Sequence, residues 1–216
     1  MPEPNVRKLS RKERERQAHR REILQAAERV MVQKGYHLAT VEEIAQQAEF
    51  AVGTIYNFFK SKADLYNHVV EGIAREFMDA FQRRVLTRAD AGEGIAGLIE
   101  LRLTHFEDHR GFFRVFFETS PGGRADPALV LPPNVVDLYD QYIEQVTGLF
   151  AEYVKGGPLE GADPLYVALA FEAIINAFVA YWSRREPSEP LGVRVAKMKQ
   201  ALLGWFRRGY FEHQAD

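Results

Sequence analysis

The chain contains no cysteine, which excludes disulfide bonds and thiolate metal sites and leaves its redox compartment undetermined. It also lacks a Gly-x-Ser-x-Gly nucleophile elbow and a glycine-rich phosphate loop, so two common sequence signs of hydrolases and nucleotide-binding enzymes are missing. No run of alternating apolar and polar residues is long enough to predict a strand. These absences favour an all-α protein without enzyme activity, and no cofactor is expected.

The 216 residues carry a net charge of −2 that is unevenly distributed. Residues 1–70 contain 12 Lys and Arg against 9 Asp and Glu, whereas the remainder contains 16 against 21. The basic residues cluster between positions 7 and 21. This segment is either a solvated tail or an arm that follows the phosphates of a polyanion such as DNA or enters its minor groove. The chain begins Met-Pro-Glu-Pro and shows no secretory signal, so we expect a cytoplasmic protein.

The most informative stretch is residues 40–62, in which two short helices are expected to flank a tight turn. Thr40 and Glu43 have the spacing of a capping box, so the first helix should begin at Val41. The second is expected over residues 52–59. Its outward face is predicted to consist of Val52, Gly53, Tyr56 and Asn57.

Helices of about two turns are not stable alone and need support from their neighbours. An amphipathic helix precedes them and should end at Gly35, a residue suited to the left-handed conformation after a helix. Ser61 with Asp64 repeats the capping pattern and opens a helix that runs to about Val85. Three helices around a small core, with a short and exposed third helix, form a helix-turn-helix domain.

Several residues of this stretch recur in order at fixed distances: Gly35-Tyr36, Thr40-Val41, Ile44-Ala45, Gly53-Thr54-Ile55-Tyr56, Phe59, Ser61-Lys62 and Leu65. Together they resemble the DNA-binding signature of the tetracycline-repressor (TetR) family of bacterial transcription regulators. The resemblance covers about the first third of the chain. It implies phosphate contacts from Thr40, Thr54, Tyr56 and Lys62, and positions near the base edges for Val41, Val52, Gly53 and Asn57. Lys60 is also suitable for a phosphate contact.

The sequence departs from the family pattern at the turn between the two short helices. Glu49, Phe50 and Ala51 stand where glycine, a small aliphatic residue and serine are usual, and Lys60 replaces proline. We expect Glu49 to adopt a left-handed conformation at a cost of about 1 kcal/mol. Ala51 offers no side-chain oxygen to cap the second helix.

Few side chains on the outward face can read bases. Asn57 can pair with adenine and Val52 can contact a thymine methyl, while no arginine or glutamine is present for guanine. We therefore expect an operator half-site that favours A·T pairs. The alternative is a helical hairpin that only packs, with Tyr56 and Asn57 solvated.

The rest of the chain is predicted to be a larger helical domain over residues 66–216, following a DNA-binding domain over residues 1–65. Helices are expected at residues 95–110, 134–155, 165–183 and 192–211, with an aromatic segment at 112–117 and a loop at 121–133. The helix at 165–183 has the length of a membrane span, but Glu172 near its centre would be costly in lipid. A helix buried on two sides, against its own domain and a partner subunit, fits better.

The TetR resemblance implies a homodimer whose interface is a four-helix arrangement. The interface is predicted to contain Ala170, Ile174, Ala177, Tyr181, Met198, Leu202 and Trp205. Two-fold symmetry would place two recognition helices about one DNA turn apart and require a near-palindromic double-stranded operator.

The larger domain contains more aromatic side chains than a small core needs, which indicates a cavity for an apolar or aromatic effector. The predicted lining is Arg102, His105, Phe113, Phe116, Phe117, Tyr139, Tyr142, Glu172 and Asn176. Glu172 and Asn176 share a helix face, and either can orient the effector through a hydrogen bond. A packed core whose polar groups are satisfied internally remains the alternative.

His105 and His109 lie one helical turn apart and suggest metal ligation. The glutamate between them has the wrong offset for a His-Glu-x-x-His motif, and no third ligand is evident from the sequence. No metal is expected.

The pattern as a whole predicts a cytoplasmic, homodimeric, ligand-responsive transcription repressor. We expect the effector to tilt the helix over residues 61–85 and so change the spacing of the recognition helices. Two alternatives are a helical small-molecule carrier or enzyme whose first domain only packs, and a ligand-independent DNA-binding protein.

Overall fold

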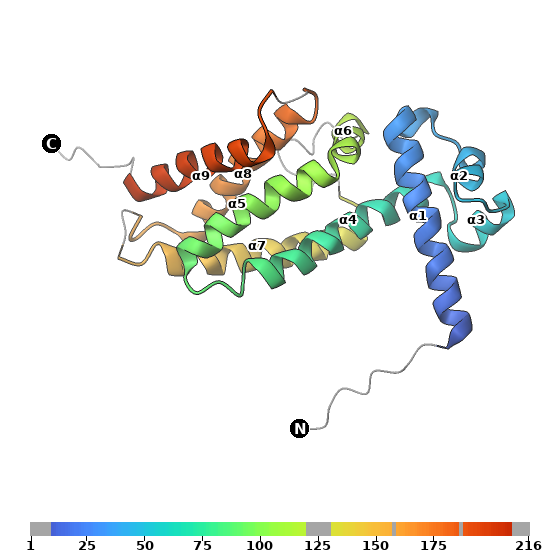
Figure 1. Ribbon diagram of the computed structural model, residues 1–216. Coiled ribbons are helices and arrows are strands. Elements are labelled where there is room, and N and C mark those ends of the chain that lie inside the picture. The colour runs from blue at the N-terminus through green and yellow to red at the C-terminus, as the bar shows by residue number, and fades with distance from the viewer. Residues whose placement is uncertain (1–9, 120–130, 157–158, 186–187, 209–216) are drawn as a thin grey trace, which may run out of the picture. The chain divides into compact units, whose positions relative to one another are not determined.

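The computed structural model describes residues 10–119, 131–156, 159–185 and 188–208, and within these ranges it contains nine helices and no strand (Figure 1). The helices are α1 (Arg11–Leu38), α2 (Val41–Gln47), α3 (Val52–Phe58), α4 (Lys62–Arg84), α5 (Ala91–Asp108), α6 (Arg110–Thr119), α7 (Pro133–Tyr153), α8 (Pro164–Trp182) and α9 (Leu191–Arg208). The all-α prediction is confirmed. Residues 7–9 of the basic segment, most of the predicted loop at 121–133 and the predicted end of the last helix at 209–211 lie outside the described residues.

The chain divides into two compact units, and the boundary falls within α4, between Val69 and Val70. We call the part up to Val69 unit 1 and the part from Val70 onward unit 2. The sequence places the boundary four residues earlier, after residue 65.

Unit 1 begins with a long helix, α1, whose start the sequence does not predict. The Ser10 hydroxyl accepts from the Glu13 backbone N–H at 3.2 Å, and the Glu13 carboxylate accepts from the Ser10 N–H at 2.7 Å. This capping box starts α1 at Arg11, so the basic residues between 11 and 21 are helical. Those residues therefore belong to a helix and not to a tail, and their contact with DNA phosphates stays a prediction.

The other two helices of unit 1 begin and end close to where the sequence predicts them. Thr40 and Glu43 form the expected capping box, with both hydrogen bonds at 3.2 Å. Gly35 interrupts α1 with a φ of 79°, which only glycine adopts readily. Figure 1 shows α2 and α3 lying beside α1. The core between them consists of Ile23, Ala26, Ala27, Val30, Met31, Val41, Ile44, Ala45, Ile55 and Phe59.

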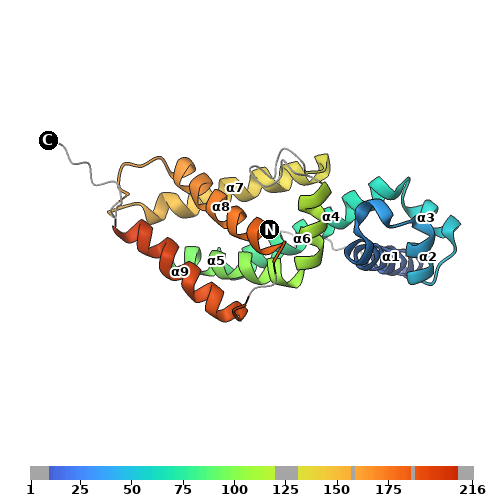
Figure 2. The ribbon, with the colours of Figure 1, turned by 90° about the horizontal axis from the view of Figure 1, so that it is seen from above.

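Unit 2 is a helical bundle with an aromatic core. In it α7 packs against α8, and α5 contacts α7, α8 and α9 (Figure 2). The core includes Phe77, Phe81, Phe106, Phe150 and Phe171, and all five side chains are at most 8% exposed.

Helix α5 begins four residues earlier than the predicted start at residue 95. The Asp90 carboxylate accepts from the Glu93 N–H at 2.8 Å and starts the helix at Ala91. A Cβ on Gly94 would lie 2.8 Å from a methyl carbon of Leu149. Glycine at this position therefore allows α5 to approach α7 closely.

By length and composition alone, α8 is the one helix in the described residues that could cross a membrane, with a mean hydropathy of 1.6 over its most apolar window. Six of its apolar side chains are buried in the unit 2 core: Val167, Ala168, Phe171, Ile175, Val179 and Ala180. Because core helices of soluble proteins pass the same test, this apolar character is explained by packing.

Candidate functional site

Helix α3 presents a polar and aromatic surface to solvent. Ile55 is 1% exposed and fixes the inner side of the helix, whereas Tyr56 on the outer side is 52% exposed. Gly53 and Asn57 are also exposed, and Val52 and Thr54 are half-buried. Thr40 and Lys60 are exposed as well. Of the nine residues predicted to contact DNA, these seven have side chains or backbone that a ligand can reach.

Val41 does not belong to this surface. Its side chain is only 7% exposed and lies in the unit 1 core with Ile44 and Ala45. The sequence places Val41 both in the inner stripe of α2 and near the base edges, and the structure retains only the first position. The predicted base contact by Val41 is therefore wrong, and Val41 is removed from the predicted set.

Lys62 has an internal role within unit 1. Its ammonium donates to the backbone carbonyls of Tyr36, His37 and Ala39 at 2.9, 3.2 and 3.0 Å. The same nitrogen lies 4.7 Å from the centre of the Tyr36 ring. These carbonyls belong to the end of α1, whose last carbonyl groups lack partners within the helix. The contacts tie the end of α1 to the start of α4.

The turn between α2 and α3 has the strain that the sequence predicts. Glu49 has a φ of 60°, in the left-handed region, and it is the one non-glycine residue with a positive φ in the described chain. Ala51 caps α3 without a side-chain hydrogen bond. The ring of Phe50 instead contacts His19 of α1, with ring centres 5.0 Å apart.

Unit 2 encloses a cavity of about 140 Å³ with mainly apolar walls. Its lining is Val70, Ile73, Ala74, Phe77, Met78, Arg102, His105, Phe112, Phe113, Phe116, Phe117, Leu131, Val135, Leu138, Tyr139, Tyr142, Asn176 and Val179. Eight of the nine residues predicted to line it are present. The ninth, Glu172, is 2% exposed and lies behind the wall.

A buried polar network connects Glu172 to the cavity wall. The Tyr142 hydroxyl donates to Glu172 at 2.5 Å, and Arg102 Nη2 lies 3.4 Å from the other Glu172 oxygen. The same Arg102 nitrogen donates to the Asn176 side-chain oxygen. Arg102 Nε is buried and has no hydrogen-bond partner among the described residues.

The network fixes the charge states at the cavity wall. Burial raises the pKa of the Tyr142 hydroxyl well above its ordinary value, and the neighbouring Glu172 acts in the same direction, so Tyr142 stays protonated and donates. Burial has the largest effect on the pKa of Arg102 and would lower it, but Glu172, Tyr142 and Tyr139 together outweigh burial and the pKa is raised. Burial lowers the pKa of His105 to about 3, so this imidazole is neutral near pH 7.

Helix α4 also forms part of the cavity wall, which the sequence did not predict. Five lining residues come from this helix: Val70, Ile73, Ala74, Phe77 and Met78. Their spacing marks an apolar stripe, which is a visible signal. Which helices this stripe faces depends on how unit 2 packs.

The predicted dimer interface is partly exposed and partly internal. Ala170, Ala177, Tyr181 and Trp205 are exposed, and Ile174 is half-buried. Met198 and Leu202, in contrast, are 4% and 0% exposed within their own chain. These two belong to the inner side of α9, so their assignment to the interface is wrong.

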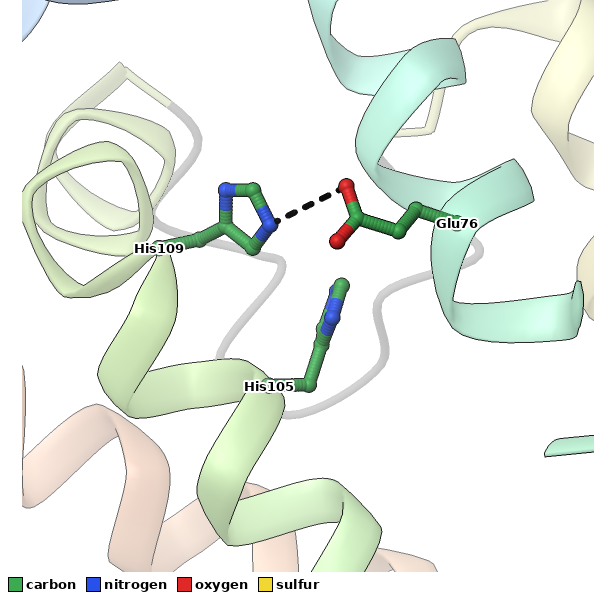
Figure 3. Close-up of side chains that lie close together, drawn as sticks. All are labelled: Glu76, His105 and His109. Carbon is green, nitrogen blue, oxygen red and sulfur yellow. Dashed lines mark ion pairs between the residues drawn. The ribbon is translucent and has the colours of Figure 1, made fainter. Parts of the chain in front are cut away.

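Glu76 of α4 lies beside the histidine pair of α5 (Figure 3). His109 Nε2 is 3.5 Å from a Glu76 carboxylate oxygen, and the rings of His105 and His109 have centres 4.8 Å apart. The structure thus supplies the third potential ligand that the sequence does not reveal.

Comparisons with known proteins agree with the geometry of unit 1. A family model described as bacterial regulatory proteins, tetR family, matches residues 23–69. The HTH-type transcriptional repressor KstR of Rhodococcus jostii (strain RHA1) is 37% identical over 187 residues, which cover 86% of this chain and 82% of that protein. The fatty acid metabolism regulator protein of Bacillus subtilis (strain 168) is 27% identical over 162 residues, covering 74% and 81%.

The fold has a close counterpart among solved structures. The transcriptional regulator FadR from Bacillus subtilis, in complex with stearoyl-CoA, superposes with a TM-score of 0.70 at 23% identity and covers 88% of this chain and 98% of that one. The relatives are transcriptional regulators rather than enzymes. With 37% identity across most of both chains and an exposed recognition helix in unit 1, this protein belongs to the tetR family of bacterial regulatory proteins and is a DNA-binding transcriptional regulator.

Proposed function

We propose that this regulator is a cytoplasmic, homodimeric repressor that an effector in the unit 2 cavity releases from its operator. The observation that carries the effector proposal is Arg102 Nε, a buried donor without a partner at the wall of a mainly apolar cavity. A buried polar group without a hydrogen bond costs about 1–3 kcal/mol, so an effector oxygen that accepts from Nε gains this energy.

The cavity indicates the chemistry of the effector. Its walls are mainly aromatic and aliphatic, and the polar groups in them are Arg102, His105, Tyr139, Tyr142 and Asn176. Arg102 is hydrogen-bonded to Asn176, and both Arg102 and Tyr142 contact Glu172. We infer an effector with an apolar or aromatic body and one carboxylate or carbonyl oxygen directed to Arg102. A cavity of this volume matches a body of about the size of a benzene ring, and a longer chain requires the walls to move.

On the DNA side, we propose that the exposed face of α3 reads one half of a near-palindromic operator. Tyr56, Thr54, Thr40 and Lys60 are the proposed phosphate contacts, and Asn57, Val52 and Gly53 are the proposed base contacts. Asn57 favours adenine and Val52 favours a thymine methyl, so the half-site is expected to favour A·T pairs.

The effector and the operator must be coupled through the protein. We propose that α4, which supplies five residues to the cavity wall and runs from unit 1 into unit 2, changes its position when the cavity is filled. To take the operator from nearly full to nearly empty, the effector must favour the released state by about 5.5 kcal/mol. Because coupling is reciprocal, operator DNA must weaken effector binding by the same factor.

The effector proposal is tested with two compounds that share an apolar body. An operator is first obtained by selection from random duplex DNA, and binding is followed by fluorescence anisotropy. We expect 4-phenylbutyrate to release the operator and 4-phenylbutylamine, which replaces the acceptor with a donor, to have no effect. Stearoyl-CoA, the ligand of the Bacillus subtilis FadR structure, tests a longer apolar chain.

The matched variant is Arg102→Lys, which keeps the positive charge opposite Glu172 but lacks the Nε donor. It should weaken release by 4-phenylbutyrate about ten-fold, corresponding to the loss of about 1.4 kcal/mol. Equal release by both compounds, or equal effector affinity of the free and the operator-bound protein, contradicts the proposal.

A further inference from the structure

We propose that Glu76, His105 and His109 form a binding site for a divalent transition-metal ion such as Zn²⁺. The nitrogen and oxygen atoms that these three side chains offer as ligands all lie within 4.8 Å of one another. Figure 3 shows the carboxylate of Glu76 and the two imidazole rings converging from α4 and α5. All three residues belong to unit 2.

The local sequence explains two of the three ligands. His105 lies in the last turn of α5, and His109, four residues later, is the residue that caps this helix. The His109 N–H donates to the His105 carbonyl at 3.1 Å, so the two side chains lie one helical turn apart on the same side. Two histidines at this spacing are the arrangement by which a single helix supplies two zinc ligands. Glu76 lies on the helix before them and is brought to the pair only by the packing of α4 against α5.

The distances fit a tetrahedral ion after small side-chain rotations. With metal–ligand bonds of about 2.0–2.2 Å, neighbouring ligand atoms in a tetrahedral site are about 3.4 Å apart. His109 Nε2 and the Glu76 oxygen are already 3.5 Å apart. The Glu76 side chain is 65% exposed, so surrounding side chains leave it free to rotate toward the ion.

The electrostatics of the site suit a cation of the zinc class. The two imidazoles offer nitrogen ligands to the ion in their neutral form, and Glu76 offers a carboxylate oxygen. The charge of Arg102, one turn away on α5, is offset by Glu172, which leaves the Glu76 carboxylate to balance the ion. Two imidazoles and one carboxylate favour Zn²⁺, Co²⁺ or Ni²⁺ over Mg²⁺ and Ca²⁺, which prefer all-oxygen sites.

Three protein ligands leave a tetrahedral ion with one further position for water or another oxygen or nitrogen donor. His105 also lines the cavity, so an ion bound here would lie at the cavity wall and connect α4 to α5. Under the proposed function, the ion would then offer the effector a second anchor and restrain the helix that we propose to move. This consequence rests on the proposed function, whereas the metal site itself does not.

The site is tested by titrating the tag-free, chelator-treated chain with Zn²⁺ in competition with a chromophoric chelator. We expect one ion per chain and no competition from Mg²⁺. Co²⁺ should bind at the same stoichiometry and give the intense visible absorption of a tetrahedral site. A weak octahedral Co²⁺ spectrum, or binding that does not saturate at one ion, overturns the proposal.

Two variants and a control assign the ligands. Glu76→Gln and His109→Gln should each weaken Zn²⁺ binding by at least about ten-fold, with the helical circular dichroism unchanged. His68→Gln is the control, because His68 also lies beside a carboxylate, 3.6 Å from Asp64, but belongs to no three-ligand cluster in the described chain. Equal Zn²⁺ affinity in all three variants contradicts the assignment. Since no DNA or effector enters this experiment, its outcome is independent of the repressor proposal.

Discussion

The buried charge pair of unit 2 shows how a single residue can serve both stability and recognition. The side chains of Arg102 and Glu172 are 17% and 3% exposed, so both charges are largely removed from water. A buried ion pair adds little to the stability of the fold compared with an apolar pair of the same size. The loss of one partner, however, is strongly destabilising because it leaves the other charge buried and unpaired. Glu172 is therefore the counterion that balances the charge of Arg102 at the cavity wall.

We predict that Glu172→Gln lowers the free energy of unfolding of unit 2 by about 3–5 kcal/mol, because it leaves the Arg102 charge buried without a counterion. Urea unfolding followed by tryptophan fluorescence measures this, since Trp182 and Trp205 both lie in unit 2. The matched control is Glu152→Gln, which breaks a pair with Lys155 whose side chains are both 66% exposed and should cost less than about 1 kcal/mol. Similar losses in the two variants would show that the buried pair has no special role.

Lys60 and Lys62 are two residues apart, yet their surroundings assign them different roles. The Lys60 side chain is exposed, whereas the Lys62 ammonium binds three carbonyls within unit 1. The resemblance to the TetR family implies a phosphate contact for Lys62. The geometry favours Lys60 for the phosphate and a structural role for Lys62.

We predict that Lys60→Met lowers the slope of log K against log salt for DNA binding by about 0.9, the value for one phosphate contact. Lys62→Met should leave this slope unchanged and instead increase amide exchange at the end of α1, because three carbonyls lose their donor. Binding measured between low and moderate salt on one operator distinguishes the two. A reduced slope in Lys62→Met would contradict this prediction and support the phosphate contact that the TetR resemblance implies.

At the scale of elements, the turn that joins α2 to α3 is the weak point of unit 1. Glu49 has a positive φ, and α3 begins at Ala51 without a side-chain cap. Each feature costs about 1 kcal/mol relative to the residue that suits the position. The contact between Phe50 and His19 shows that α1 supports the turn from one side.

We predict that Glu49→Gly stabilises unit 1 by about 1 kcal/mol, because glycine adopts the left-handed conformation without a steric penalty. Within a helix, replacing glutamate by glycine lowers stability instead. Glu42→Gly in the first turn of α2 should therefore destabilise unit 1 by about 1 kcal/mol. Amide exchange of residues 41–58, measured by mass spectrometry, follows unit 1 directly. Faster exchange in Glu49→Gly than in the parent protein contradicts the prediction.

For the molecule as a whole, the exposed apolar surface of unit 2 supports the proposed homodimer. Large apolar side chains remain exposed on two helices: Leu165, Tyr166, Leu169, Phe178 and Tyr181 on α8, and Val193 and Trp205 on α9. Monomeric soluble proteins rarely expose a contiguous apolar patch of this kind. The proposed homodimer covers it, with Met198 and Leu202 removed from the predicted interface because they belong to the core.

We predict that Ala177→Glu weakens dimerisation by at least about ten-fold, because two carboxylates would meet across a two-fold interface of apolar residues. Ala177 is exposed within its own chain, so the variant should fold as a monomer with native tryptophan fluorescence. Ala89→Glu, which changes an exposed alanine outside α8 and α9, is the control. Sedimentation velocity over a range of concentrations measures the effect, and an unchanged dimer in Ala177→Glu would place the interface elsewhere.

Much of this architecture follows from the sequence because it depends on short-range spacing. The capping box at Thr40, the positive φ of Glu49 and the inward side of Ile55 each follow from residues within one or two helical turns. The aromatic lining of the cavity also follows from composition, because apolar mass of that amount must be buried together.

Other features follow only from the tertiary structure, because they depend on which helices pack against one another. Glu76 reaches His105 and His109 only because α4 packs on α5, and the inward positions of Met198 and Leu202 depend on how α9 packs on α5. Helical spacing defines an apolar face but does not state which neighbour covers it. The amino-acid sequence by itself therefore determined the family, the reading helix and eight of the eighteen residues of the cavity wall, whereas long-range packing alone decided the buried ion pair, the internal role of Lys62 and the candidate metal site.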